Sequence, residues 1–314
     1  MQRVDLAEIR ERTYKKRDAW WTVLLVDPVA SRLVRLVAPY RWITPNLLTV
    51  LATLLGLGAA VGFAMQDRAW LIAGALLFHL SFVVDCMDGK IARLNGTGSM
   101  FGAWFDFMFD RLRVILCAFA LFGGQYERTG QQIYLWLAVG VVSADLFRYL
   151  NSSQMSKIKR AMRSRLAEVR GEPAEPAEPE DISGEAADDA GPTLTVAESP
   201  SVPEQARLPM PDDPQQTTYI QVRNWLLRRR IRMHLVSGIE FEMFVFIIGP
   251  LTGWVIGVSI VAGMLLLAME AALVFKLWLA TRRYTVQLAA AEAAAAESSG
   301  TGVEVTSRLT PIQR

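Results

Sequence analysis

Long apolar runs, separated by short polar turns, dominate two regions of the chain. A helix needs about 20 mostly apolar residues to cross the hydrocarbon core of a bilayer. Six runs are long enough, at residues 47–66, 69–87, 102–122, 132–150, 236–256 and 258–281. The short turns between them favour antiparallel neighbours, as in a helical bundle. The pattern predicts an all-α, polytopic membrane protein with six transmembrane helices.

Two further segments are amphipathic and adjoin predicted spans. Residues 19–40 combine paired tryptophans and an apolar face with Arg32 and Arg35, and we expect breaks at Pro28 and Pro39. Residues 217–235 are amphipathic in the same way and contain a cluster of arginines. Such segments lie along a membrane surface. Because the cluster adjoins a span, anionic lipid headgroups fit it better than nucleic acid does. We therefore expect an N-terminal interfacial amphipathic segment, membrane lipids as partners and no nucleic-acid partner.

Charge is segregated along the chain. Residues 171–216 hold 12 acidic residues, one base (Arg207) and 9 of the 14 prolines, so this stretch carries −11 and the remainder +13, against a total of +2. Such a composition cannot bury a core, which predicts a disordered linker. If the N-terminus is cytoplasmic, Arg68 and Arg128 are the only basic residues in the loops that face outward. By the positive-inside rule, we expect a protein of the cell membrane or inner membrane with both termini on the cytoplasmic side.

These observations predict five regions. They are a cytoplasmic and interfacial segment (1–46), four spans (47–150), a cytoplasmic linker (151–235), two spans (236–281) and a cytoplasmic tail (282–314). Within the linker, we expect residues 171–216 to be disordered and residues 217–235 to form a basic interfacial helix. The polar residues 1–18 do not resemble a signal peptide. Two cysteines inside apolar runs, Cys86 and Cys117, exclude a disulfide scaffold. A large soluble helical protein is the weaker alternative, because the long apolar runs coincide with the charge bias.

Four aspartates mark the inner ends of the second and third spans. Asp85 and Asp88 are three residues apart, and Asp106 and Asp110 are four apart, so each pair shares a helix face. A short turn joins the two helices, which brings the four acids to one depth. Unpaired carboxylates there are costly unless cations neutralise them. Oxygen ligands select hard ions, so the cluster predicts two divalent cations, Mg²⁺ or Mn²⁺, which clamp a phosphate.

The alternative for each aspartate is an ordinary interfacial ion pair. The available partners are Lys90, Arg93, Arg111 and Arg113. For all four acids at this spacing that interpretation is weak. Small residues at Gly89, Ala92 and Gly102 allow a ligand close to the helices, and Arg93 suits phosphate oxygens.

The pattern Asp85-x2-Asp88-Gly89-x2-Ala92-Arg93-x8-Gly102-x3-Asp106-x3-Asp110 resembles the complete signature of the CDP-alcohol phosphotransferases. Thr44-Pro45-Asn46 also resembles the family's lead into the first span. The similarity covers about residues 40–281, and the signature itself takes 26 positions. It implies six transmembrane helices, a cavity open to the cytoplasm, a homodimer and a two-metal site.

The resemblance also implies roles for the signature residues. Asp85, Asp88, Asp106 and Asp110 would hold the metals, and Asp110 would also act as general base. Gly89, Ala92, Arg93 and Gly102 would line the CDP site. The implied enzyme moves a phosphatidyl group from CDP-diacylglycerol, or another CDP-alcohol, to a small polar alcohol and releases CMP. Alternatives are a CDP-choline-like donor with a lipid acceptor, a cation transporter or channel, and a non-catalytic membrane scaffold.

Acceptor selectivity should come from polar residues on the inner halves of the remaining spans. A phosphorylated acceptor would want several arginines, and Arg111, Arg113 and Arg148 could provide them. Asp145 and Arg148, three apart, are also able to neutralise each other. Glu240 and Glu242, at the start of the fifth predicted span, are further candidates, and the alternative for them is a contact with Arg230 or Arg232. The remaining candidates, on the sixth predicted span, are Glu270 and Lys276.

Overall fold

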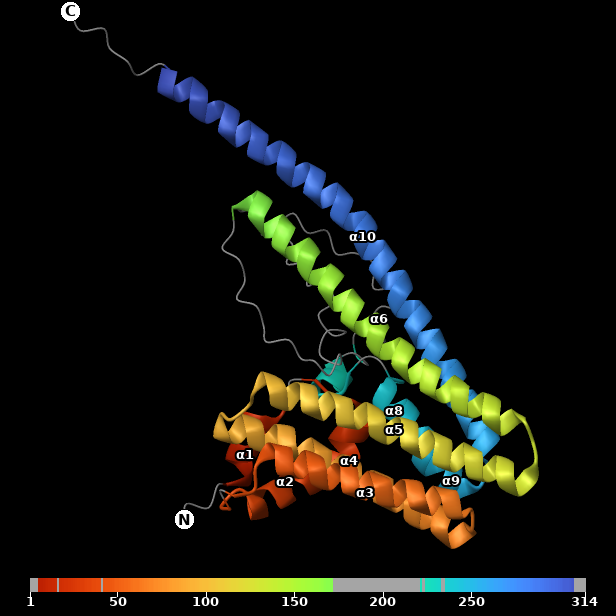
Figure 1. Ribbon diagram of the computed structural model, residues 1–314. Coiled ribbons are helices and arrows are strands. Elements are labelled where there is room, and N and C mark those ends of the chain that lie inside the picture. Colours follow the sequence, from red (N-terminus) through yellow and green to blue (C-terminus); the bar gives the residue numbers. More distant parts are fainter. Residues whose placement is uncertain are drawn as a thin grey trace, which may run out of the picture. The chain divides into compact units, whose positions relative to one another are not determined.

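The computed structural model describes residues 5–15, 17–40, 42–171, 221, 224–232 and 235–307, with side chains up to residue 296. Regular structure in these residues is helical, which confirms the predicted all-α class (Figure 1). The one β-type pairing recorded among them is an isolated parallel bridge between Asp18 and Ile231. The predicted disordered segment 171–216, apart from Gly171, lies outside the described residues.

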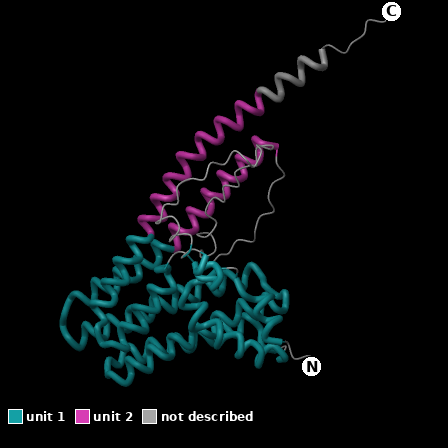
Figure 2. The backbone as a smooth tube through the Cα atoms, turned by 180° about the vertical axis from the view of Figure 1, so that it is seen from behind, with its two compact units in different colours: residues 1–148, 194–269 teal, residues 149–193, 270–314 magenta. Residues whose placement is uncertain are grey.

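The chain divides into two compact units (Figure 2). The first comprises residues 1–148 and 194–269, and the second comprises residues 149–193 and 270–314. Within the second unit, Asn151 Nδ2 donates a hydrogen bond to Glu270 Oε2 over 2.6 Å. Glu270, a candidate for acceptor binding, is therefore engaged by an amide within that unit.

Three helices form the centre of the first unit: α3 (Pro45–Met65), α4 (Arg68–Asn95) and α5 (Met100–Thr129). Helix α3 packs along both others. Its start follows from local chemistry, because the Thr44 hydroxyl accepts from Leu47 N at 3.3 Å and Pro45 occupies the first turn. Close packing depends on Gly62, where an added Cβ would lie 3.0 Å from the backbone of Gly74. A short turn from Gly96 to Ser99 then reverses the chain between α4 and α5.

In the part of the chain that the structure describes, four helices are long and apolar enough to cross a membrane: α3, α4, α6 (Ile133–Arg170) and α10 (Val255–Ser307). They coincide with the first, second, fourth and sixth predicted spans. Helix α6 does not end near residue 150, because it continues to Arg170. The first 20 residues assigned to the linker therefore continue α6 as a helix.

The other two predicted spans differ from these four for physical reasons. Helix α5 has 30 residues, but its first half carries Asp106, Asp110, Arg111 and Arg113. The fifth predicted span consists of α8 (Gly238–Met243), a π-helical turn η4 (Phe244–Ile248) and α9 (Gly249–Thr252). At 1.5 Å per residue this run rises about 22 Å, less than the bilayer core. Among the described residues, four helices are thus candidate spans by length and composition.

The N-terminal region contains α1 (Leu6–Thr13), a π-helical turn η1 (Thr22–Val26) and α2 (Asp27–Val37). The expected break at Pro28 was wrong, because the chain stays helical from Trp20 to Val37. Proline lacks an N–H and its ring crowds the carbonyl four residues earlier. The π-helical turn just before it, in which Asp27 N donates to Thr22 O, accommodates both effects.

Two arginines hold the helix ends opposite the aspartates. Arg68 Nη1 donates to Pro250 O at 2.7 Å and Nη2 to Leu251 O, near the end of α9. Arg128 Nη1 donates to Gln66 O at 3.5 Å, just past the end of α3. Cations at helix C-termini are favoured by the unpaired carbonyls and the helix dipole. The two bases predicted to face outward therefore have structural partners.

Candidate metal centre

The structure brings together three of the four signature aspartates. One carboxylate oxygen from each of Asp85, Asp88 and Asp106 lies within 4.8 Å of the other two. Asp85 and Asp88 come from the C-terminal part of α4, and Asp106 from the first half of α5. Asp88 is buried, and the other two are partly buried. The spacings of three and four residues place the acids on the facing sides of antiparallel helices.

Asp110 lies beside this group and is held by an arginine. Arg113 Nη2 binds Asp110 Oδ1, and Arg113 Nη1 lies 3.3 Å from Asp85 Oδ1. The alternative of an ordinary ion pair therefore applies in part to Asp85 and Asp110. Asp88 and Asp106 have no recorded ion pair in the part of the chain that the structure describes.

Arg113 crosses the bundle to reach these acids. Its Nη1 also donates to Ser81 Oγ at 3.0 Å, and Ser81 Oγ donates to Ala52 O at 2.7 Å. Its aliphatic part passes over Gly56, where an added Cβ would lie 2.6 Å from Arg113 Cδ. Gly56 is therefore required by the path of this side chain. The guanidinium links α3, α4 and α5 at the site.

Thr49 is a residue of the site that sequence reasoning did not assign. Its Oγ1 donates to Asp88 Oδ2 at 2.5 Å. Thr49 lies one turn into α3, after the Thr44-Pro45-Asn46 start, so the start of this helix also places the Thr49 hydroxyl at the site. Thr49 and Asp88 are separated by 39 positions in the sequence, so no helical periodicity could have predicted their contact. The family resemblance of the Thr44-Pro45-Asn46 segment did point to this part of the chain.

The donor set fits a hard divalent cation. The three clustered groups are carboxylates, which bind Mg²⁺, Ca²⁺ and Mn²⁺ in preference to soft metals. Asp106 Oδ1 is buried and has no hydrogen-bond partner among the residues described. A buried carboxylate oxygen left unpaired is costly, and a bound cation would satisfy it. The three aspartates therefore form a group that is able to hold a metal ion.

The residues expected around CDP occupy two places. Gly89 lies beside Arg93, whose guanidinium nitrogens are 3.7 Å from the position of an added Cβ at Gly89. Arg93 is exposed, and its Nε donates to Thr13 O at 3.0 Å. Gly102 faces Asn46, whose Oδ1 is 3.2 Å from an added Cβ. Ala92 is partly buried on α4, in the last turn before the Gly96 cap.

The charged residues that were expected to bind the acceptor form ion pairs and hydrogen bonds with partners other than the predicted ones. Arg111 binds Asp145 through Nη1, and its Nη2 donates to Glu242 Oε1 at 3.1 Å. Asp145 is thus bound from α5, and Glu242 contacts Arg111 and not Arg230 or Arg232. Glu240 Oε2 accepts from Ser237 N at 2.9 Å and so caps α8. The contact with Arg230 or Arg232 that was one expectation for Glu242 is therefore wrong, and both glutamate side chains are buried.

Comparison with known proteins identifies relatives of this region. Residues 42–169 match the family model described as CDP-alcohol phosphatidyltransferase. A CDP-diacylglycerol–glycerol-3-phosphate 3-phosphatidyltransferase from Cereibacter sphaeroides is 40% identical over 84 residues, which is 26% of this chain and 38% of that protein. A phosphatidylinositol phosphate synthase from Corynebacterium glutamicum is 35% identical over 89 residues, or 28% and 37% of the two chains.

An archaetidylinositol phosphate synthase from Pyrococcus horikoshii is 40% identical over 70 residues, or 22% of this chain and 36% of that protein. The matched part of the chain spans less than two fifths of these relatives, at 38%, 37% and 36% of their lengths. The family match and the four apolar helices together indicate an integral membrane protein.

Proposed function

We propose that the chain transfers a phosphatidyl group from a CDP-alcohol to an alcohol, because residues 42–169 match the CDP-alcohol phosphatidyltransferase family model. The donor is CDP-diacylglycerol, the acceptor is a small polar alcohol, CMP is released, and the pathway is phospholipid synthesis. The observation that carries this proposal is the convergence of Asp85, Asp88 and Asp106 within 4.8 Å, inside the matched region.

Asp85, Asp88 and Asp106, with Asp110 at the edge, would hold two divalent cations, Mg²⁺ or Mn²⁺. When bound, such ions neutralise charge on the phosphates of the donor and on the departing CMP. Thr49 orients the Asp88 carboxylate by its hydrogen bond, and Arg113 orients Asp85 and Asp110. Orientation of this kind matters because phosphoryl transfer depends chiefly on positioning and on charge stabilisation.

Asp110 serves as general base in this proposal. Arg113 binds its Oδ1, so the acceptor hydroxyl gives its proton to Oδ2. The acceptor oxygen forms a bond to the phosphorus that carries the diacylglycerol. The bond from that phosphorus to the bridging pyrophosphate oxygen breaks, and its electron pair leaves with CMP. Gly89, Ala92, Arg93 and Gly102 line the CDP site, where the exposed guanidinium of Arg93 is available to phosphate oxygens.

The names of the relatives guide the choice of acceptor. They contain glycerol-3-phosphate, phosphatidylinositol phosphate and archaetidylinositol phosphate. We therefore place glycerol-3-phosphate and inositol phosphate first among candidate acceptors. Arg111 and Arg113, expected at the acceptor phosphate, are bound by carboxylates. A phosphate-bearing acceptor thus needs a base outside these two pairs, or a rearrangement of them.

In the membrane, we propose six spans with both termini and the metal centre on the cytoplasmic side. Helix α5 is the third span, since its 30 residues rise about 45 Å and the arginines of its charged half are paired with carboxylates of α4, α6 and α8. The run Gly238–Thr252 is the fifth, shorter span. Exposed Leu24, Leu25 and Leu36 support an N-terminal segment along the inner surface. By family analogy the protein is a homodimer.

Purified protein tests this function through metal-dependent CMP release. We expect release with CDP-diacylglycerol plus an acceptor and Mg²⁺ or Mn²⁺, and its loss in Asp106→Asn and Asp110→Asn. Matched controls are Asp67→Asn and Glu127→Gln, exposed acids at the opposite ends of α4 and α5, which should leave the rate unchanged. Release with CDP-choline and a lipid acceptor would favour the soluble donor. Release that survives both aspartate substitutions would refute the assignment.

A further inference from the structure

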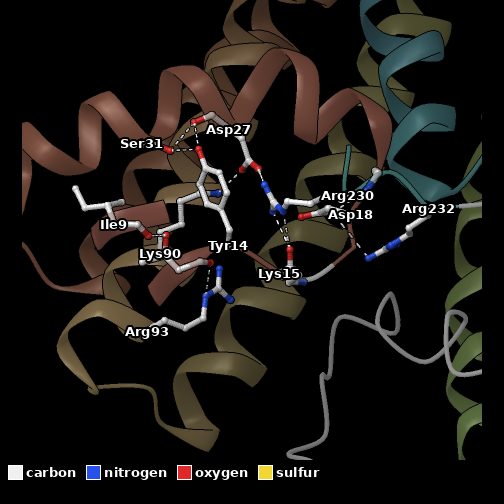
Figure 3. A network of polar contacts seen from close by, with 12 residues as sticks. Ile9, Tyr14, Lys15, Asp18, Asp27, Ser31, Lys90, Arg93, Arg230 and Arg232 are labelled. Carbon is white, nitrogen blue, oxygen red and sulfur yellow. Dashed lines mark hydrogen bonds and ion pairs between the residues drawn. The ribbon is translucent and has the colours of Figure 1, made fainter. Parts of the chain in front are cut away.

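Lys90 lies inside the signature but on the far side of its helix from the aspartates. It follows Asp88 by two residues on α4, which is about 200° around the helix axis. Asp88 faces the metal group, and Lys90 is directed to the N-terminal region, where its side chain is 5% exposed (Figure 3). The contacts of Lys90 therefore bear on the rotation of the helix segment that carries Asp85 and Asp88.

Asp27, the first residue of α2, binds Lys90 from outside the bundle. Lys90 Nζ lies 2.8 Å from Asp27 Oδ1, and Arg230 Nη1 lies 3.3 Å from Asp27 Oδ2. The Asp27 side chain is 4% exposed, so both of its oxygens are committed to cations in a buried setting. Buried pairs of this kind fix geometry, because removal of one partner leaves an uncompensated charge.

Tyr14 closes the same network. Its ring lies under both cations, 4.2 Å from Arg230 Cζ and 5.7 Å from Lys90 Nζ. Its hydroxyl is 2.6 Å from Ser31 Oγ on α2. Cation–π contacts gain strength where the cation is desolvated. Tyr14 thus keeps both cations beside Asp27 and ties them to α2.

Arg230 connects the segment after residue 216 to the network around Asp27. It donates from Nε and Nη2 to Lys15 O, at 3.0 and 2.8 Å. Its φ of +61° is a left-handed conformation that a side chain seldom adopts. Two backbone bonds hold it there, from Asp18 N to Arg230 O at 2.8 Å and from Arg232 N to Asp18 O at 3.0 Å. Several contacts therefore converge on one strained residue.

We propose that Asp27 is a positioning residue for the metal centre, and that Arg230 completes its anchorage. By holding Lys90, Asp27 fixes the rotation of the inner end of α4 and so aims Asp85 and Asp88 at the shared site. The signature helix has a second tie to the same region through Arg93 Nε and Thr13 O. This inference rests on the proposed function for its biological role, but the expected effect on metal binding does not require turnover.

The test is equilibrium Mn²⁺ binding by the purified full chain in detergent, with free Mn²⁺ measured by electron paramagnetic resonance. Asp27→Asn, Lys90→Met and the double variant should each bind Mn²⁺ about tenfold more weakly than the wild type, the lower end of the effect of outer-shell partners. The double variant should be no weaker than Asp27→Asn alone, because that substitution already breaks the contact with Lys90. It also leaves neither partner as an uncompensated buried charge, so it is the variant to use if a single one fails to fold.

Val34→Ala is the matched control. Val34 is fully buried on α2, like Asp27, but makes no side-chain polar contact. It should lower the thermal midpoint and leave Mn²⁺ affinity unchanged. Wild-type affinity in the folded double variant, an equal loss in Val34→Ala, or no Mn²⁺ binding by the wild type would overturn the proposal. If the variants bind weakly while the wild type releases no CMP from any donor, the proposed function fails and the positioning role stands.

Discussion

Thr49 on α3 donates a hydrogen bond to Asp88 on α4, with 2.5 Å between Oγ1 and Oδ2. The bond leaves the other oxygen of Asp88 for the metal group and fixes the plane of the carboxylate. Hydrogen-bond partners of metal ligands usually change metal affinity by 10- to 100-fold when they are removed. Thr49 is therefore a supporting residue of the proposed metal site.

Substitution of Thr49 by valine keeps the shape of the side chain and removes the donor. We expect Thr49→Val to weaken Mn²⁺ binding by about 10- to 100-fold. Thr53→Val, one turn later on α3, removes a hydroxyl that bonds only to the carbonyl of Thr49 at 2.8 Å. Equal Mn²⁺ affinity in the two variants would contradict the role of Thr49.

Gly56 allows Arg113 to pass between helices, so Gly56→Ala should displace that arginine. The new methyl group would lie 2.6 Å from Arg113 Cδ. Overpacking of this kind costs about 1–3 kcal/mol of stability, and CMP release should fall because Asp110 loses its partner. Gly58→Ala on the same helix meets Leu77 at an ordinary 3.5 Å and should be silent. The thermal midpoint and the rate of CMP release check both variants, and the expectation fails if the two behave alike.

The ion pairs of Arg111 with Asp145 and Glu242 should stabilise the first unit without taking part in the reaction. All three side chains are buried, at 8%, 3% and 5% exposure. Arg111→Met would leave two carboxylates without this partner and should destabilise the protein by about 3–5 kcal/mol. Arg165→Gln, which removes an exposed pair with Glu168, should leave the thermal midpoint unchanged. A wild-type midpoint in Arg111→Met would show that the network is dispensable.

Helix α6 should cross the membrane between Gln131 and Ser153, both of which are exposed. In a chain with Cys86 and Cys117 replaced by alanine, an impermeant maleimide should label Gln131→Cys in intact cells. It should label Ser153→Cys only after permeabilisation, because the inner ends of the spans carry the bases. Labelling of both positions from the same side would refute the proposed topology.

The periodicity of the sequence predicted those side-chain arrangements that depend on a single helix or a single turn. The spacing of Asp85 and Asp88, and of Asp106 and Asp110, with the short turn at Gly96, was enough to anticipate a shared cluster. Partners from distant helices were not predictable in this way. Asp145 was paired with its neighbour Arg148 on sequence spacing, whereas Arg111 reaches it from α5. Lys90 was considered a partner for the aspartates, but its helix position turns it to Asp27.

The break expected at Pro28 shows a second limit, because a π-helical turn absorbs the missing donor and has no clear sequence pattern. The span formed by α5 stays a prediction, because this helix is not among the four that are apolar enough by length and composition. The same aspartates and arginines that reduce its hydropathy are those that the fold turns inward.

The central claim is that the aspartate cluster carries metal-dependent transfer of a phosphatidyl group. The most direct measurement follows CDP-diacylglycerol and an acceptor, glycerol-3-phosphate or inositol phosphate, with purified protein, and quantifies CMP and the lipid product together by mass spectrometry. We expect one lipid product per CMP, dependent on the acceptor and on Mg²⁺ or Mn²⁺, and absent in Asp106→Asn. CMP formation that needs neither acceptor nor divalent cation, or that persists in Asp106→Asn, would contradict it.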